Sequence, residues 1–179
     1  MTIKVNTITT IHKGKIFELV SENVTFNTGS TSKMDIIRHS GASAIIPISS
    51  NNMVVLLRQY RHATGGYIWE IPAGILEQNE THLDCAKREL TEETGYDASL
   101  WQKLGEIIPA PGYSDERIHL FLAAGLEGKK QNLDENEILE VYAVKLIDAY
   151  KMIFNGEIQD SKTIAGLLMA RQYLQDAEE

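Results

Sequence analysis

Apolar and polar residues alternate with a period of two over much of the first half of the chain. This period is typical of β-strands that bury one face. Turn-forming residues separate the alternating stretches, at Gly14, in the polar segment 27–33, at 49–52 (SSNN) and at Gly65 and Gly66. The pattern therefore predicts strands over residues 3–12, 15–26, 34–39, 42–48, 53–60 and 67–71.

One segment departs from this period and predicts a helix between Thr81 and Gly95. Thr81 stands three residues before Asp84, which fits an N-terminal capping box. Gly95 stands where a left-handed C-terminal cap belongs. Residues three and four apart form one mostly apolar face, which can pack on a sheet: Leu83, Ala86, Leu90 and Thr94.

The second half of the chain mixes both periods. Its pattern predicts strands over 100–107, 118–124 and 138–146, and a short helix over 147–154. Ser161 is expected to cap a final helix, and the segments 109–117 and 127–137 are expected to be loops. No repeat or linker divides the chain, so we expect an α/β (α+β) fold with a mixed sheet and helices on its faces.

Composition narrows the class of protein. The 179 residues, 43% of them hydrophobic, suffice for one domain with a sizeable core. The net charge of −8 and the lack of a basic run predict no nucleic-acid partner. No apolar run reaches the length of a membrane span, and the first residues lack the apolar core of a signal peptide. The single Cys85 excludes an internal disulfide, so a cytoplasmic location is expected.

The predicted helix carries three carboxylates on one face, from Glu89, Glu92 and Glu93. Like charges at this spacing oppose a helix by roughly 0.2–0.5 kcal/mol per pair, and a bound cation would offset the cost. Carboxylate oxygens suit Mg²⁺, and Mn²⁺ can replace it. Arg88 precedes Glu92 by four residues and can pair with it. The alternative is an acidic, solvated helix with accidental spacing.

This stretch resembles the Nudix box, in which glycines, glutamates and an arginine recur at fixed spacing. The matching positions are Gly74, Glu80, Arg88, Glu89, Leu90, Glu92, Glu93 and Gly95. Tyr96 stands where an aliphatic residue is commoner. Pro111, sixteen residues after Gly95, and the segments QYRHATGGYIWEIPAG, PAPGYSDE and GEIQDSKT resemble the ADP-ribose pyrophosphatase branch of that family.

The resemblance implies a fold and an assembly. Residues 41–179 are expected to form the α/β/α sandwich of a Nudix hydrolase domain. Residues 1–40 look like the additional N-terminal strands of that branch, which serve there as a dimerisation arm, often by exchange between protomers. A homodimer is therefore expected. The sequence alone equally allows a hairpin that packs on its own domain.

The resemblance also implies roles for individual residues. Metal ligands are expected at Ala73 (by its carbonyl), Glu89, Glu92 and Glu93. Gly74, Glu80 and Gly95 are expected to shape and orient the box, with a place near the metal shell as the alternative for Glu80, while Arg88 orients a glutamate. Substrate contacts are expected from Arg61, Glu70, Pro111 and Ser114. The general base is expected in the segment LDENEIL, at Glu137 first and Glu135 second, with Glu140 also available.

The implied activity is hydrolysis of the diphosphate of ADP-ribose to AMP and ribose 5-phosphate, with Mg²⁺ as cofactor. Within the same chemistry, another nucleoside diphosphate sugar such as GDP-mannose or ADP-glucose is the alternative. From other classes of protein, a nucleotide sensor that does not cut its ligand and an interaction scaffold stay open. The complete set of box carboxylates favours the enzyme over both.

Overall fold

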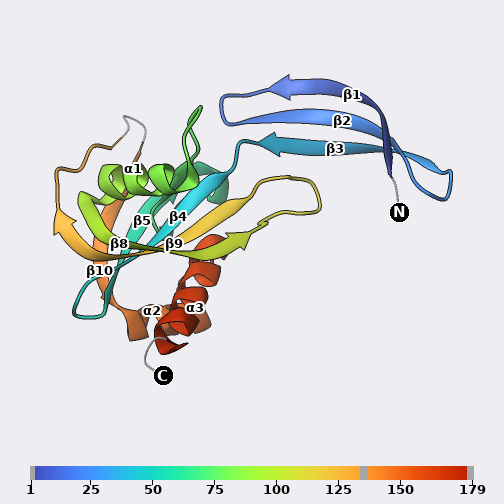
Figure 1. The fold of residues 1–179 in the computed structure, drawn as a ribbon. Coiled ribbons are helices and arrows are strands. Elements are labelled where there is room, and N and C mark those ends of the chain that lie inside the picture. Colours follow the sequence, from blue (N-terminus) through green and yellow to red (C-terminus); the bar gives the residue numbers. More distant parts are fainter. Residues whose placement is uncertain (1–2, 134–136, 177–179) are drawn as a thin grey trace. The chain divides into compact units, whose positions relative to one another are not determined.

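A computed structural model describes residues 3–133 and 137–176. The chain forms two compact units, and each is described by itself (Figure 1). The first unit contains Met1–Gly41 together with Ile108–Arg117. The second contains Ala42–Ile107 and Ile118–Glu179. The segment that carries Pro111 thus belongs with the N-terminal residues.

The first unit contains a three-stranded antiparallel sheet of β1 (Lys4–Lys13), β2 (Phe17–Thr25) and β3 (Thr31–His39). The sequence pattern placed the start of the third strand at residue 34, which is wrong. The β2–β3 turn is tight: Phe26 N–H donates to the Ser30 carbonyl at 2.9 Å, and Gly29 has a φ of 82°. The polar residues after it therefore continue the ladder.

The segment 108–117 is fixed to β3 within this first unit. Ile37 N–H donates to the Tyr113 carbonyl at 2.7 Å, and Asp115 N–H donates to the Ile37 carbonyl at 3.1 Å. Arg38 Nη1 adds an ion pair with Asp115 at 2.8 Å. This loop therefore has one defined course along β3.

The second unit is built on a mixed sheet of seven strands. Its main path runs β10-β5-β4-β9-β8, with β4 parallel to β9, while β6 pairs with β5 and β7 pairs with β4. The strands are β4 (Ala42–Ile48), β5 (Met53–Arg61), β6 (Gly66–Glu70), β7 (Ala73–Ile75), β8 (Tyr96–Ile107), β9 (Ile118–Gly128) and β10 (Leu139–Lys145). A single 3-10 turn, η1 (His62–Thr64), follows β5.

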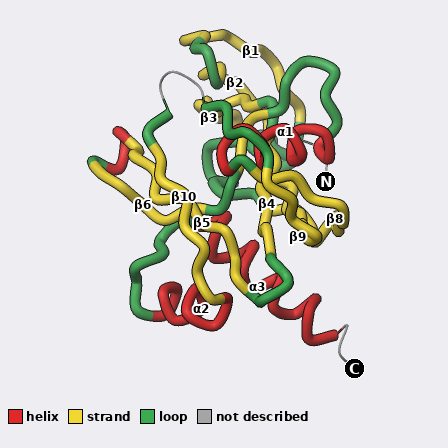
Figure 2. The backbone as a smooth tube through the Cα atoms, turned by 90° about the vertical axis from the view of Figure 1, so that its left-hand side faces the viewer, coloured by secondary structure: helices red, strands yellow, loops and turns green. Residues whose placement is uncertain are grey.

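Three helices of the second unit cover this sheet: α1 (His82–Thr94) on one face, and α2 (Leu146–Phe154) and α3 (Ser161–Asp176) on the other (Figures 1 and 2). Successive side chains of β4 point to opposite faces of the sheet, which explains why helices pack on both faces. Ile45 packs with Leu90 of α1, whereas Ile46 points to the opposite face and packs with Leu167 of α3. The predicted mixed sheet with helices on its faces is confirmed.

Further element boundaries differ from the sequence prediction, among them the start of β8 and the cap of α3. β8 begins at Tyr96 rather than residue 100, because its ladder with β9 extends until Tyr96 lies opposite Gly128. α3 is capped by Asp160 rather than Ser161, since Thr163 N–H donates to Asp160 Oδ2 at 2.9 Å and Ser161 is already helical. Ser161 was therefore the wrong cap.

The helix α1 matches its prediction at both ends. Thr81 Oγ1 accepts from the N–H of Asp84 at 3.2 Å, and Gly95 ends the helix with a φ of 70°. Across the described residues, none of the helices combines the length and apolar character that a membrane crossing needs.

Candidate active site

The box begins at Gly74 in β7, a strand that contacts α1. An ideal Cβ on Gly74 would lie 1.8 Å from Glu89 Oε1 and 2.0 Å from Glu89 Cδ, so the Glu89 carboxylate occupies the space of a side chain there. The thiol of Cys85 donates to the Gly74 carbonyl at 3.5 Å, and burial raises the pKa of Cys85 to about 11. A neutral, buried thiol of this kind packs rather than reacts.

Arg88 is the hub that connects the box loop to the helix. Its Nε and Nη2 each contact one oxygen of Glu80 at 2.9 Å. Its Nη1 donates to Glu89 at 2.5 Å and to Glu92 at 3.0 Å, and Nη2 also donates to the Ile75 carbonyl at 3.1 Å. These contacts use all five N–H donors of a guanidinium. Arg88 lowers the pKa of Glu80, which therefore stays charged in the network.

Glu89 and Glu93 form a buried carboxylate pair. Glu93 is 2% exposed, and its Oε2 accepts from the backbone N–H of Ala73 at 2.8 Å. Burial is the main reason why the pKa of Glu93 is well above its ordinary value, and the charges of Glu89 and Glu137 add to the effect. Burial likewise raises the pKa of Glu89 to about 7. Both carboxyl groups thus resist ionisation unless positive charge is placed beside them.

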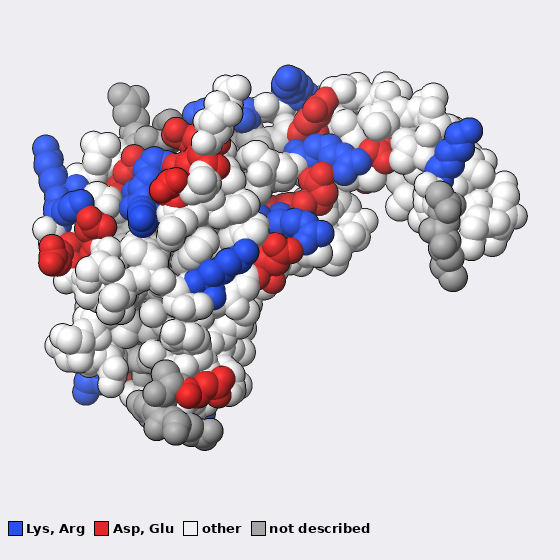
Figure 3. Space-filling model, viewed as in Figure 1, with Lys and Arg blue, Asp and Glu red and all other residues white. Residues whose placement is uncertain are grey.

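Glu92 is held differently from the buried pair. Within the described residues, no group of three or more His, Cys, Asp or Glu side chains is arranged to hold a metal ion. The Glu92 side chain is 36% exposed and turns to Arg88. Acidic and basic side chains accordingly lie next to one another over α1 (Figure 3). Glu89 and Glu93 still fit a divalent cation, because a buried pair of carboxylates with raised pKa values is stabilised by positive charge.

The loop that follows β9 is anchored beside this pair. Gln131 Nε2 donates to the Glu93 carbonyl at 2.5 Å, and the N–H of Tyr60 donates to the Ile138 carbonyl at 2.9 Å. Between these anchors lies Glu137, whose charge contributes to the raised pKa values of Glu89 and Glu93.

The other two carboxylates expected to supply a base are those of Glu135 and Glu140. Glu135 lies outside the described residues. Glu140 belongs to β10, is exposed, and accepts from the Tyr142 hydroxyl at 2.6 Å. Among the acidic residues expected to supply a base that the structure describes, Glu137 is therefore the one whose charge acts on the buried pair.

A second buried network lies at the end of β6. Glu70 is 3% exposed, and its Oε2 accepts from Arg61 Nε at 2.7 Å. Lys162, itself 8% exposed, contacts Glu70 and lies 3.1 Å from Asp160. The charge of Arg61 also acts on Glu93. The network therefore ties Arg61 to the start of α3 and brings its positive charge near the buried pair.

Lys162 and Asp160 were not identified from the sequence. Glu70 and Lys162 are 92 positions apart, so no short motif or helical spacing could connect them. The only signal was the segment GEIQDSKT, which contains both Asp160 and Lys162.

Pro111 and Ser114 belong to the first unit, whereas the box carboxylates belong to the second. The N–H of Ser114 donates to the Ala110 carbonyl at 2.9 Å, and Ser114 Oγ accepts from the N–H of Glu116 at 3.1 Å. Both expected substrate contacts thus lie in a turn with internal hydrogen bonds.

Residues 38–167 match the family model described as the NUDIX domain, and they include the whole arrangement around α1. The chain belongs to the Nudix family. The family that the box residues suggested is thereby confirmed. The match covers well over half of the chain and runs from the end of β3 into α3.

Three curated relatives of this Nudix chain carry different descriptions. An ADP-ribose pyrophosphatase of Bacillus subtilis (strain 168) is 39% identical over 167 residues, 92% of this chain and 88% of the relative. A methanol dehydrogenase activator of Bacillus methanolicus is 42% identical over 168 residues, again 92% and 88%. A GDP-mannose pyrophosphatase of Citrobacter koseri is 33% identical over 175 residues, 87% of this chain and 91% of the relative.

A solved structure described as an ADP compounds hydrolase resembles this Nudix chain with a TM-score of 0.87. The match covers 99% of this chain and 96% of the chain in that structure, at 20% sequence identity. At that identity the likeness shows the fold alone, and it confirms the expected α+β architecture.

Replacing Gly74 by Ala is expected to lower kcat by roughly 10²-fold with the fold intact, because displacing a catalytic group by about 1 Å commonly has that effect. The new methyl group would overlap the Glu89 carboxylate, which sits at the end of a flexible side chain and can rotate away. Steady-state kinetics and a thermal melt measure the two effects. Gly128→Ala is the matched control, since a Cβ there meets nothing within 4 Å. Equal activity of Gly74→Ala and Gly128→Ala would contradict the proposed close approach.

Proposed function

We propose that this chain hydrolyses the diphosphate of ADP-ribose to AMP and ribose 5-phosphate. The observation that carries the proposal is the buried pair Glu89 and Glu93 inside a complete Nudix box. The ADP-ribose pyrophosphatase of Bacillus subtilis, 39% identical over most of both chains, supports the choice of substrate.

The cofactor we propose is Mg²⁺, which Mn²⁺ can replace. Glu89 and Glu93 would hold it, with Glu92 and the carbonyl of Ala73 as further ligands. When bound, such an ion neutralises diphosphate charge and lowers the pKa of water. The ligand set consists of oxygen atoms, as these hard cations require.

Side chains of the protein would supply the general base, bind the diphosphate and position the metal ligands. Glu137 would accept the proton of the attacking water as general base, and Glu135 is the second candidate for that role. Arg61 would bind the diphosphate through its guanidinium fork, held by its contact with Glu70. Arg88 would keep the orientation of Glu89 through the 2.5 Å contact of its Nη1.

The supporting residues complete this proposal. Glu80 would hold the box loop by its paired contacts with Arg88, while Gly74 and Gly95 allow the close approach and the helix end described above. Pro111 and Ser114 would contact substrate from the loop of the first unit.

Turnover of a panel of nucleoside diphosphate sugars with Mg²⁺ tests the substrate. We expect kcat/KM for ADP-ribose to exceed the values for GDP-mannose and ADP-glucose, with AMP and ribose 5-phosphate as products. A preference for GDP-mannose would favour the alternative that the Citrobacter koseri relative supports. Tight nucleotide binding without product, with or without EDTA, would instead identify a sensor.

The stability of the metal-free protein is expected to fall as pH rises from about 5 to about 8, because a proton held only in the folded state is lost. The pKa of Glu89 is about 7 in the folded protein, raised by burial from an ordinary 4.5. The stability that this bound proton contributes is therefore complete when the pH is below the ordinary pKa of Glu89. It disappears as the pH rises through the pKa of Glu89 in the folded protein. The shift corresponds to about 3 kcal/mol.

Urea unfolding in EDTA across this pH range measures the effect, with Glu89→Gln as the control that removes the titrating group. Added Mg²⁺ should stabilise the wild type more at the alkaline end, because metal and proton compete for the same carboxylates. If wild type and Glu89→Gln showed the same dependence on pH, the assigned cause would be wrong.

We further propose that residues 1–40 form a dimerisation arm and residues 41–179 a hydrolase domain, and that the protein is a cytoplasmic homodimer. Every residue of β1 is exposed, and this edge strand can pair with another chain. Apolar side chains exposed on the first unit include Ile3, Val5, Ile8, Ile11, Ile16, Phe17 and Met34. Cell fractionation tests the location.

Substituting both Ile8 and Ile11 by Lys is expected to convert the dimer to a monomer, because two charges would be placed in an apolar interface. The two side chains are 60% and 54% exposed, so the fold of one chain should tolerate the change. Light scattering measures the mass. Leu100→Lys, at a position 64% exposed on β8, is the control. A monomeric wild type would refute the arm's role.

A further inference from the structure

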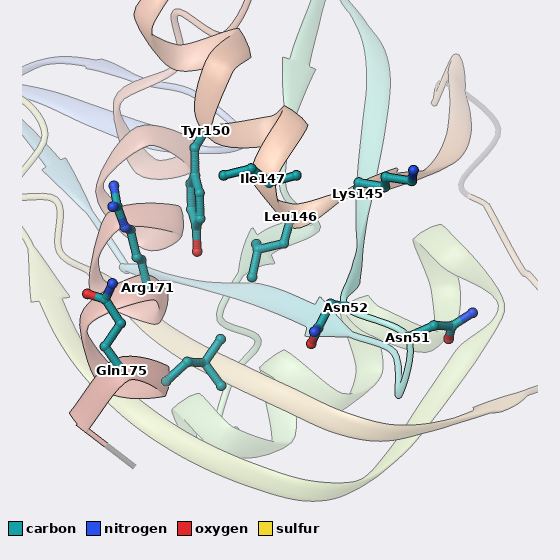
Figure 4. Close-up of a pocket in the computed structure, with 9 residues that line it drawn as sticks. Asn51, Asn52, Lys145, Leu146, Ile147, Tyr150, Arg171 and Gln175 are labelled. Atoms are coloured by element: carbon teal, nitrogen blue, oxygen red, sulfur yellow. The ribbon is translucent and has the colours of Figure 1, made fainter. Parts of the chain in front are cut away.

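A cavity of about 470 Å³ opens in the second unit, on the side of the sheet that carries α2 and α3 (Figure 4). The box carboxylates lie on α1, which covers the opposite face. The cavity is therefore separate from the proposed site of hydrolysis. Its walls come from the β4–β5 turn, the start of α2 and the end of α3: Asn51, Asn52, Lys145, Leu146, Ile147, Tyr150, Arg171, Leu174 and Gln175.

The polar groups of this wall are rich in hydrogen-bond donors. Of these nine residues none is acidic, although the chain has a net charge of −8. Lys145 and Arg171 supply positive charge, and three amide side chains supply further N–H groups. The N-terminus of α2 carries no side-chain cap. The Leu146 N–H donates to the Asn52 carbonyl at 3.0 Å and Asp148 stands in the first turn, so it is the helix dipole that favours an anion here.

Tyr150 supplies an independent observation that points to a ligand site. The residue is 8% exposed, and its hydroxyl has no hydrogen-bond partner among the described residues. The hydroxyl points into the space between Leu146 and Arg171 (Figure 4). Burial raises the pKa of Tyr150, so the group stays protonated at neutral pH and remains a donor. The Arg171 guanidinium lies 5.3 Å from the centre of the Tyr150 ring.

We propose that this cavity binds a small phosphorylated compound, with its phosphate between Arg171, the Tyr150 hydroxyl and the start of α2. A phosphate accepts several hydrogen bonds and suits both a guanidinium fork and a helix N-terminus. The apolar side chains of Leu146 and Leu174 can cover the organic part of the compound. The volume suits a ligand of that size.

NMR titration of ¹⁵N-labelled protein in EDTA tests this site with inorganic phosphate, ribose 5-phosphate and AMP as probes. We expect the amide signals of Ile147 and Asn52 to shift and saturate at millimolar probe. Arg171→Met should weaken the affinity at these signals by about tenfold or more, because a charged, forked donor is lost. Tyr150→Phe removes the hydroxyl alone and should weaken it severalfold.

Arg58→Met is the matched control, because the Arg58 guanidinium also lies 5.3 Å from an aromatic ring, that of Trp69. The Arg58→Met substitution should leave the affinity measured at the Ile147 and Asn52 signals unchanged. Tighter binding of a phosphomonoester than of inorganic phosphate would show that the organic part is also recognised, and equal binding would show that the phosphate alone is recognised. Both results support the site.

Two results would overturn the proposal. One is the absence of saturable shifts at Ile147 and Asn52 with all three probes. The other is equal affinity of the wild type, Arg171→Met and Tyr150→Phe at these signals. Neither result bears on hydrolysis of ADP-ribose, which the substitutions in this cavity are expected to leave unchanged.

Discussion

Replacing Glu93 by Gln is expected to lower kcat by roughly 10³-fold or more, an effect typical of the loss of an essential group in a catalytic site. The substitution keeps the size of the side chain and an oxygen that can accept from the Ala73 N–H. It removes the charge that we propose holds the metal ion. The metal-free variant should be as stable as the wild type or more so, because burial disfavours the charged carboxylate of Glu93, with the charge of Glu89 adding to the effect, and an amide carries no such cost.

Steady-state kinetics with ADP-ribose and a thermal melt in EDTA separate the two effects. Glu127→Gln is the matched control, since Glu127 is an exposed glutamate at the end of β9. It should keep wild-type rates. Near-normal kcat in Glu93→Gln would mean that the metal site has been assigned to the wrong carboxylates.

Replacing Arg88 by Lys is expected to lower kcat/KM by about 10²-fold and the free energy of unfolding by about 2 kcal/mol. A lysine keeps the charge but offers three donors at one point, whereas Arg88 uses five in a plane. It cannot hold both oxygens of Glu80 and also contact Glu89. The box loop and the buried carboxylate would then lose their fixed relation.

Kinetics and urea unfolding measure the Arg88→Lys variant, and Arg58→Lys serves as the control for the substitution itself. Arg58 stacks on Trp69 outside the box, so its replacement should leave kcat/KM unchanged. A rate equal to the wild type in Arg88→Lys would show that the network of Arg88 is not needed for catalysis.

Features set by nearby residues could be predicted from the sequence. The capping residues Thr81 and Gly95 fixed both ends of α1, and the helical spacing placed Arg88 beside Glu92. Even here local rules have limits. Ser161 and Asp160 are both good caps, and the structure selects Asp160 because its carboxylate also contacts Lys162.

Features set by distant residues could not be predicted in this way. The contact of Lys162 with Glu70 depends on how α3 meets the end of β6, 92 positions earlier in the chain. The extra length of β8 and β9 comes from their mutual pairing, whereas the residues themselves alternate only weakly. The different settings of the three glutamates have a related origin: the Glu92 carboxylate pairs with Arg88 and is 36% exposed, whereas Glu89 and Glu93 are buried.

Equilibrium binding of Mn²⁺ to the wild type and to Glu93→Gln, followed by electron paramagnetic resonance in the presence of AMP, tests the central claim most directly. We predict that the wild type binds the ion and that the substitution weakens its affinity by at least about tenfold, as loss of a charged ligand requires. Equal affinity of the two proteins, or no binding by the wild type, would contradict a metal-dependent hydrolase built on this buried pair.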